Sequence, residues 1–191
     1  PSLEGPLPWD VVVDRISHEV PFYRTWLKHA AARGVKVINN PFMWTADDKF
    51  FGASLCSKLG LAHPKTLVLP NKDYGPAVVH VESLRNLVYP LDWDSIIDYV
   101  GLPCVLKTRR LGYDGKGQRY LRKPADLEPA WNAIGNVPLI LEGFVHFERE
   151  VSIVGVRSTT GEVRAYPIVA NTHKDGILRV TLAPHRHPDL Q

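Results

Sequence analysis

The hydrophobic pattern of the first 45 residues predicts a strand, a helix and a second strand. An apolar run at residues 9–14 lies between turn-forming residues and predicts a buried strand. Between residue 17 and Gly34, apolar residues recur at the spacing of a helix, namely Phe22, Trp26, Leu27, Ala30 and Ala31. A second strand-like run follows at residues 35–39. Because two strands joined through a helix usually lie parallel, this pattern predicts a β-α-β unit.

The remainder of the chain alternates helical patterns with short strand-like runs. Helical spacing covers residues 46–59, 92–99 and 124–133. Strand-like runs occupy residues 78–81, 103–106, 119–121, 137–141, 150–156, 163–170 and 177–182. Turn-forming residues at 159–162 and 175–176 predict two hairpins, and the proline-rich residues 70–90 predict a loop or an insertion. This mixture predicts an α/β protein.

The composition is that of an ordinary globular protein, since the 191 residues are 45% hydrophobic and 23% charged. No apolar run approaches the ~20 residues that cross a bilayer, and the first residues do not resemble a secretory signal. We therefore expect no membrane partner and a cytoplasmic location. The net charge of +3 is small, so we expect no nucleic-acid partner. Cys56 and Cys104 lie far apart in sequence and predict buried free thiols.

A glycine-rich basic segment at residues 108–118 carries the clearest chemical signal. It follows the strand-like run that ends at Lys107. Its glycines are Gly112, Gly115 and Gly117, and the cations in or beside it are Lys107, Arg109, Arg110 and Lys116. Such a loop can lay backbone N–H groups and positive charge over a phosphate chain. The glycine spacing matches neither a Walker A loop nor a dinucleotide fingerprint, and three glycines alone are also typical of a solvated hairpin turn.

Over its full length, the segment TRRLGYDGKGQ resembles the phosphate-covering loop of ATP-grasp enzymes. The resemblance is strongest to the 5-(carboxyamino)imidazole ribonucleotide synthase branch of that family, and it extends over residues 107–184. A second segment, NTHKDGILRVTLAP at residues 171–184, resembles the part of the same branch that faces acceptor and bicarbonate. In the order of their elements, residues 9–106 are more similar to ATP-grasp proteins of the glutathione-synthetase and glutamate-ligase type.

The resemblance implies a partial ATP-grasp fold. An incomplete N-terminal β-α-β domain would occupy residues 1–45, and the nucleotide-binding lobes would occupy residues 46–191. The C-terminal part that supplies metal ligands in the family has no counterpart in this sequence. The implied cofactors are ATP and Mg²⁺, and the expected partner is a small anionic substrate, with a homodimer left open.

The resemblance also assigns site residues. Those expected to bind the nucleotide are Lys49, Lys107, Gly112, Gly115, Gly117, Gln118, Glu142, Phe144, Val145 and Glu150. Those expected to act in catalysis are Tyr113, Asp114, Lys116, His173 and Arg179. Taken one by one, Lys49, Glu142 and Glu150 could instead be solvated surface residues, and His173 could be a structural histidine. No metal ligand is assigned, because His185 and His187 lack a third ligand at zinc spacing.

The implied enzyme is a carboxylate–amine ligase, in which ATP activates a carboxylate as an acyl phosphate and an amine then attacks. In the branch resembled, the carboxylate is bicarbonate and the amine is aminoimidazole ribonucleotide. Such phosphoryl transfer depends on cations and hydrogen-bond donors that position the triphosphate. Two alternatives stay open: an amino-acid or peptide ligase, favoured by residues 9–106, and a nucleotide-binding module without catalysis, favoured by the missing metal ligands. At position 143, glycine stands where the family more often has glutamate.

Overall fold

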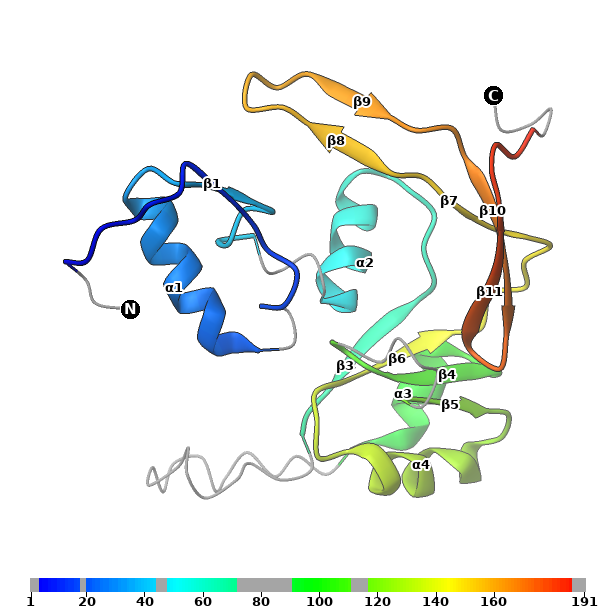
Figure 1. Ribbon diagram of the computed structural model, residues 1–191. Helices are drawn as coiled ribbons and strands as arrows, with labels where there is room; N and C mark the ends of the chain where they lie inside the picture. The colour runs from blue at the N-terminus through cyan, green and yellow to red at the C-terminus, as the bar shows by residue number, and fades with distance from the viewer. Residues whose placement is uncertain (1–3, 18–19, 44–47, 72–90, 111–116, 187–191) are drawn as a thin grey trace, which may run out of the picture.

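The computed structural model describes residues 4–17, 20–43, 48–71, 91–110 and 117–186 of the chain. The first unit consists of strand β1 (Val11–Val13), helix α1 (Pro21–Ala32) and strand β2 (Lys36–Ile38). β1 and β2 pair in parallel, with Val12 opposite Val37. The predicted β-α-β arrangement is therefore present (Figure 1).

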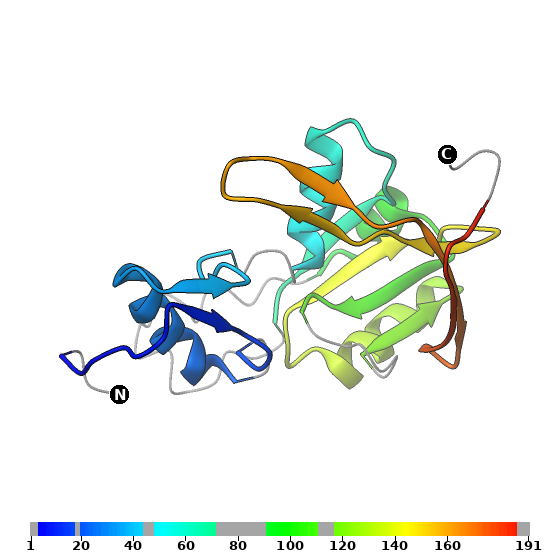
Figure 2. The ribbon, with the colours of Figure 1, turned by 45° about the horizontal axis from the view of Figure 1, so that its top comes forward.

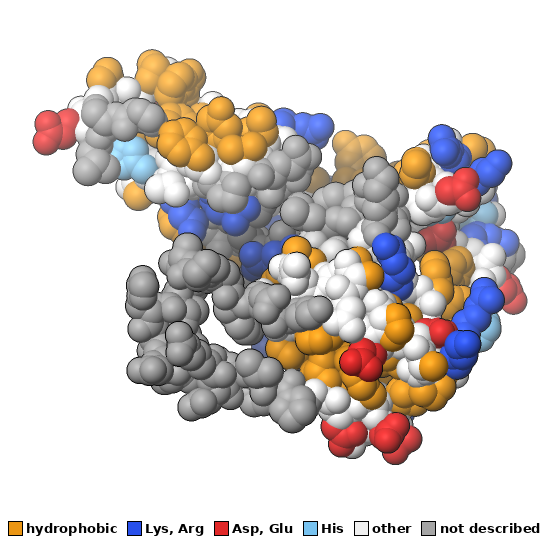
Figure 3. Space-filling view, turned by 90° about the horizontal axis from the view of Figure 1, so that it is seen from below, with side chains coloured by type: hydrophobic (Ala, Val, Ile, Leu, Met, Phe, Trp, Pro, Cys, Tyr) orange, Lys and Arg blue, Asp and Glu red, His pale blue; other side chains and the backbone are white. Residues whose placement is uncertain are grey.

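The described residues cover the β1–β2 pair on one face, and most of β1 is exposed, so the prediction of a buried first strand is wrong. Helix α1 contacts β2 and buries Leu27 and Ala30, whereas Val11 and Val13 remain 50% and 62% exposed. A two-stranded sheet with one helix has no second layer for its other face. Figure 3 shows hydrophobic side chains gathered on the surface of this part of the molecule, at the left.

A four-stranded antiparallel sheet, in the order β3-β6-β4-β5, forms the centre of the larger unit. Its strands are β3 (Thr66–Leu69), β4 (Cys104–Thr108), β5 (Gln118–Leu121) and β6 (Leu139–Gly143). Two helices pack against it, α3 (Trp93–Val100) and α4 (Leu127–Ile134), and the 3-10 turn η3 (Pro124–Asp126) leads into α4 (Figure 1). The predicted types of β4, β5, β6, α3 and α4 are confirmed, with small shifts at their ends, whereas β3 has no counterpart among the predicted strands.

Alternation along these strands separates a core face from an open face. Leu106 of β4, Leu121 of β5 and Leu141 of β6 are buried in one cluster with residues of α3 and α4. The intervening positions carry polar and aromatic side chains such as Lys107, Tyr120 and Glu142, together with the buried aliphatic residues Val105 and Ile140. Since directly paired residues of antiparallel strands share a face, Val105 lies on the same face as its two partners, Tyr120 and Glu142. The sequence therefore directs a set of polar side chains toward the face that the helices leave open.

Helix α2 (Lys49–Lys58) begins later than the predicted residues 46–59. Asp48 caps it, because its side chain accepts from the backbone N–H groups of Phe50 and Phe51. None of the residues of α2 is buried. The position of this helix therefore depends strongly on the contacts of its ends.

A three-stranded antiparallel sheet follows, built from β7 (Glu150–Ser152), β10 (Val169–Lys174) and β11 (Ile177–Leu182) in the order β11-β10-β7. Strands β8 (Gly155–Arg157) and β9 (Val163–Ala165) form a separate hairpin that projects from it (Figures 1 and 2). The predicted single strands 150–156 and 163–170 are each divided, because the chain leaves the three-stranded sheet after β7, forms the β8–β9 hairpin and returns to the sheet as β10. The predicted turn at Asp175 and Gly176 is confirmed, and both residues have positive φ, as a tight hairpin turn requires.

Both cysteines are free thiols; Cys104 is buried, as predicted, whereas Cys56 is only partly buried. Burial raises the pKa of the Cys104 thiol to about 11. Within the described part of the chain, no helix combines the length and the apolarity needed to cross a membrane. The predicted strand at residues 78–81 lies outside the described residues.

Candidate functional site

A cleft of about 550 Å³ lies between the open face of the four-stranded sheet and the three-stranded sheet. Its volume is typical of sites that bind small molecules. Many of the residues expected from the sequence to bind nucleotide or to act in catalysis line it, namely Lys107, Gln118, Glu142, Phe144, Val145, Glu150 and His173. These residues come from β4, β5, β6, β7, β10 and the connection after β6. The fold thus brings together side chains that are up to 66 positions apart (107 to 173).

An ion pair between Lys107 and Glu142 occupies the sheet side of the cleft. Lys107 of β4 donates from Nζ to Oε2 of Glu142 on β6 over 2.6 Å. Glu142 is directly opposite Val105, two residues before Lys107, so the pair is diagonal on one face of the sheet. The side chains are 31% and 13% exposed, respectively. The cleft therefore presents a cation for phosphate and a carboxylate that can accept from an amino or hydroxyl group.

Aromatic side chains form one wall of the cleft. Tyr120, Phe144 and Phe147 line it, and the rings of Tyr120 and Phe144 meet edge to face with centroids 6.2 Å apart. The backbone of Phe144 is fixed because its N–H donates to the carbonyl of Pro103. Such a wall suits the flat face of a purine base. The sequence interpretation missed Tyr120, although its position two residues after Gln118 on one strand places both side chains on the same face.

Gly143, where the resemblance leads one to expect glutamate, lies close to the backbone of another element. A Cβ atom at this position would lie 3.3 Å from the carbonyl oxygen of Val100 in α3. A side chain here would therefore start against the end of α3, on the helix-covered face of the sheet. Close approach of the two backbones gives a physical reason for glycine at this position.

Glu150 and His173 form a second polar pair on the opposite side of the cleft. Nδ1 of His173 on β10 lies 2.7 Å from Oε2 of Glu150 on β7. The sequence interpretation placed His173 on the acceptor side, apart from the nucleotide contacts of Glu150. In the structure the two side chains are direct neighbours, and both line the cleft.

The start of the glycine-rich segment is tied to the N-terminus of α2. Lys49 donates from its backbone N–H to the carbonyl of Arg109 and from Nζ to the carbonyl of Thr108, each over 3.0 Å. Oδ2 of Asp48 lies 3.0 Å from Nε of Arg109 and 3.6 Å from Nε of Arg110, as ion pairs rather than as hydrogen bonds of good geometry. The lining of the cleft does not include Lys49. Its contacts in the structure hold α2 against the end of β4.

Other expected site residues lie outside the cleft or outside the described residues. Gly117 accepts through its carbonyl from the N–H of Thr108. Arg179 falls at a register shift between β10 and β11, where Thr172 pairs with Val180 and His173 with Leu178; it is exposed and does not line the cleft. The expected residues outside the described part are Gly112, Tyr113, Asp114, Gly115 and Lys116.

The part of the chain that the structure describes contains no clear set of ligands for a metal ion. Among these residues, no group of three or more His, Cys, Asp or Glu side chains is arranged to hold a metal ion. His185, one member of the pair considered above for zinc, instead lies with Nε2 3.4 Å from Arg149. The described cleft offers the cation of Lys107, the imidazole of His173 and aromatic faces, which fit a nucleotide better than a bare metal ion.

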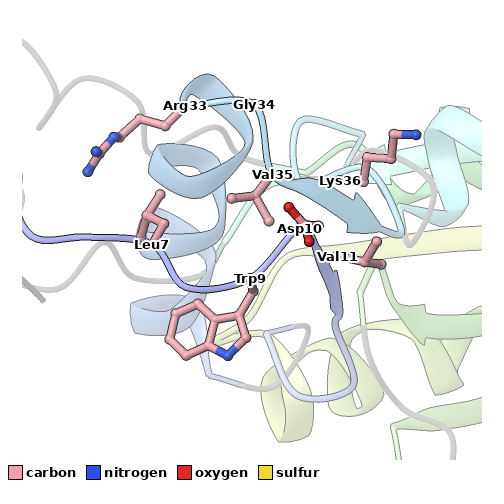
Figure 4. A pocket seen from close by; sticks show the side chains of 8 residues that line it. All are labelled: Leu7, Trp9, Asp10, Val11, Arg33, Gly34, Val35 and Lys36. Atoms are coloured by element: carbon pink, nitrogen blue, oxygen red, sulfur yellow. The ribbon is translucent and has the colours of Figure 1, made fainter.

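A second hollow, of about 510 Å³, lies on the first unit and is lined mainly by residues just before β1 and β2 (Figure 4). Figure 4 shows Trp9 and Leu7 beside α1, with Asp10 and Lys36 near the strand ends. It therefore lies at the amino ends of the two parallel strands. Ligands of open α/β sheets bind at the carboxyl ends of the strands, and none of the expected site residues lines this hollow.

Comparison with known proteins agrees with this geometry. The family described as "ATP-grasp domain" matches residues 78–191. N5-carboxyaminoimidazole ribonucleotide synthase of Pseudomonas aeruginosa is 46% identical over 143 residues, which cover 75% of this chain and 35% of that protein. This chain therefore spans about a third of the length of that relative.

Solved structures of similarly named enzymes share the fold over almost the whole chain. The N5-carboxyaminoimidazole ribonucleotide synthetase of Thermus thermophilus is 31% identical, with a TM-score of 0.69, over 92% of this chain and 41% of that one. An ADP complex of a synthetase of the same name is 28% identical, with a TM-score of 0.69, over 94% of this chain and 42% of that one. These names denote enzymes, which confirms the predicted enzyme family. The chain belongs to the ATP-grasp family.

Proposed function

We propose that this chain is the nucleotide-binding part of an ATP-dependent carboxylate–amine ligase, which activates bicarbonate for attack by aminoimidazole ribonucleotide. Similarity to the P. aeruginosa N5-carboxyaminoimidazole ribonucleotide synthase, at 46% identity, supports this substrate assignment. Within this proposal, residues 1–45 form the domain that precedes the ATP-grasp part, and residues 46–191 supply the nucleotide-binding lobes. This chain covers less than half of each similar enzyme named above. The proposal therefore concerns part of a larger enzyme.

The observation that carries the proposal is the cleft itself, where Lys107 and Glu142 lie beside the aromatic wall of Tyr120, Phe144 and Phe147. A cation, an acceptor and aromatic faces within one cleft match the three parts of an adenine nucleotide. The ADP complex of the similar synthetase supports the same class of ligand. In this assignment Lys107 binds phosphate, Glu142 accepts from the adenine amino group, and Glu150 accepts from the ribose.

Each residue is assigned a role in positioning charge rather than in covalent chemistry. Lys107 would offset the negative charge of the phosphates as a point charge on a long side chain. The remaining expected residues of the glycine-rich segment, Tyr113, Asp114 and Lys116 among them, would cover the phosphates and exclude water. Mg²⁺, when bound with ATP, neutralises phosphate charge and polarises the transferred group. His173 and Arg179 are assigned to the side of the cleft that faces the anionic substrate.

A phosphate-release assay tests this function. We expect the larger enzyme that contains this chain to release phosphate from ATP only when both bicarbonate and aminoimidazole ribonucleotide are present, and we expect this release to fall strongly when Lys107→Ala and Lys116→Ala are combined. Amino acids replace the ribonucleotide in a parallel reaction. Release that depends on amino acids alone would identify an amino-acid ligase instead. ATP binding without release under any acceptor would identify a non-catalytic module.

A further inference from the structure

The pair formed by Glu150 and His173 has a defined donor and acceptor. Nδ1 of His173 lies 2.7 Å from Oε2 of Glu150. A carboxylate can only accept, so Nδ1 carries the hydrogen and donates it. The hydrogen bond engages Oε2 and leaves Oε1 to accept from a second donor. The two side chains are 41% and 34% exposed, respectively, so a ligand in the cleft can reach them.

His173, rather than its neighbour Asn171, binds Glu150, because the side chain of Asn171 is hydrogen-bonded to other residues. Asn171 lies directly opposite Glu150 in the β7–β10 register, and with a period of two His173 shares that face. The amide of Asn171, however, donates to Ser152 and accepts from Oγ1 of Thr181 over 3.0 Å. These bonds hold Asn171 within the sheet. His173 is therefore the side chain of β10 that holds Glu150 in place.

The two carboxylates of the cleft differ in what binds them. Glu142 is bound by the cation of Lys107, whereas Glu150 is bound by the imidazole of His173 within its own three-stranded sheet. A hydrogen bond to one oxygen fixes the rotamer of the carboxylate without consuming its capacity to accept from sugar hydroxyls. We propose that His173 is a positioning residue that orients Glu150 toward the ribose of the nucleotide. By holding Glu150 in this way, His173 sets the preference for ribonucleotides over deoxyribonucleotides. This inference rests on the proposed binding of ATP.

The proposal makes a specific statement about selectivity. A hydrogen bond from a ribose hydroxyl to a carboxylate distinguishes ATP from a deoxy analogue by about tenfold or more. When His173 is removed, Glu150 must be ordered at the moment of binding, which lowers that preference by roughly three- to tenfold. The affinity for the deoxy analogue hardly changes, because the analogue has no hydroxyl to reward the ordered carboxylate.

Calorimetric titration of the 191-residue chain with ATP, 2′-deoxyATP and 3′-deoxyATP tests the proposal, with wild type compared to His173→Ala. We expect the preference for ATP over at least one deoxy analogue to fall in His173→Ala. The variant His173→Asn should keep most of it, since the amide nitrogen of Asn can take the place of Nδ1 as donor. The matched control is Lys174→Ala, which changes the next residue of β10 on the opposite face and should leave the preference unchanged.

A double-mutant cycle separates positioning from a merely structural role. In a Glu150→Ala background, His173→Ala should have no further effect on the preference. The proposal is overturned by an unchanged preference in His173→Ala, by an equal loss of affinity for all three nucleotides, or by a wild type that binds all three equally. If His173→Ala does not fold, a folded His173→Asn that loses the preference overturns it. Failure of the wild type to bind ATP would instead overturn the proposed function, and this inference with it.

Discussion

Lys107 and Glu142 share a hydrogen bond of 2.6 Å in a cleft where the Glu142 side chain is only 13% exposed. Removing the cation leaves a poorly solvated carboxylate, which is more costly than losing the attraction alone. We therefore expect Lys107→Met to lower the free energy of unfolding by about 1–2 kcal/mol. The double variant Lys107→Met/Glu142→Gln should recover most of that loss, as urea denaturation can show.

A surface ion pair provides the control for this prediction. Arg164 and Glu162 pair over 2.7 Å with side chains 84% and 57% exposed, and solvent screens such pairs strongly. Arg164→Ala should therefore leave the unfolding midpoint within experimental error. Equal instability of the single Lys107 variant and of the double variant would show that the carboxylate is not the source of the cost.

The buried thiol of Cys104 gives a prediction of pH dependence. Burial raises its pKa to about 11 in the folded state, above the range of an exposed thiol. The unfolded chain then loses this proton at lower pH than the folded chain, so stability present below about pH 9 is lost as the pH rises toward 11.

We expect a disulfide reagent at pH 8 to modify Cys56 well before Cys104. Equal rates for Cys56→Ser and Cys104→Ser variants would contradict this.

Helix α2 is connected to the glycine-rich segment through its first residues. Asp48 both caps the helix and lies close to Arg109 and Arg110. Asp48→Ala should lower the unfolding free energy by about 1 kcal/mol, because the cap is lost. Asp48→Asn keeps a capping oxygen and removes only the charge, so its stability should stay closer to wild type. Urea denaturation of both variants measures this, and equal losses would mean that the ion pairs, not the cap, hold α2.

Elements with a strong local pattern were predictable from the sequence, and those that depend on tertiary contacts were not. The turn at Asp175 and Gly176 and the strand Ile177–Leu182 follow from turn chemistry and alternation alone. The division of residues 150–156 into β7 and β8 could not be predicted, because Val151 pairs with Ala170 and Val156 with Arg164. Which partner a residue chooses depends on the whole fold rather than on its own sequence.

At the scale of the molecule, resemblance identified residues, and the structure supplied their relations. Lys107, Glu142, Glu150 and His173 were all named from motifs, and all four line one cleft. Motifs did not reveal that Glu150 pairs with His173, since these residues are 23 positions apart. They also did not reveal Tyr120, which lies in the cleft because β5 pairs with β4. Motifs likewise did not reveal that Lys49 donates to the carbonyl of Thr108, and its expected contact with nucleotide stays a prediction.

The central claim, that the cleft between the two sheets binds ATP through Lys107, is tested most directly by calorimetric titration of the chain with Mg²⁺ and ATP. The comparison is between wild type and the double variant Lys107→Met/Glu142→Gln, which we expect to fold normally. The account predicts one site in the wild type and an affinity at least about tenfold lower in the double variant. Equal affinity in the two proteins, or no binding by the wild type, would contradict it.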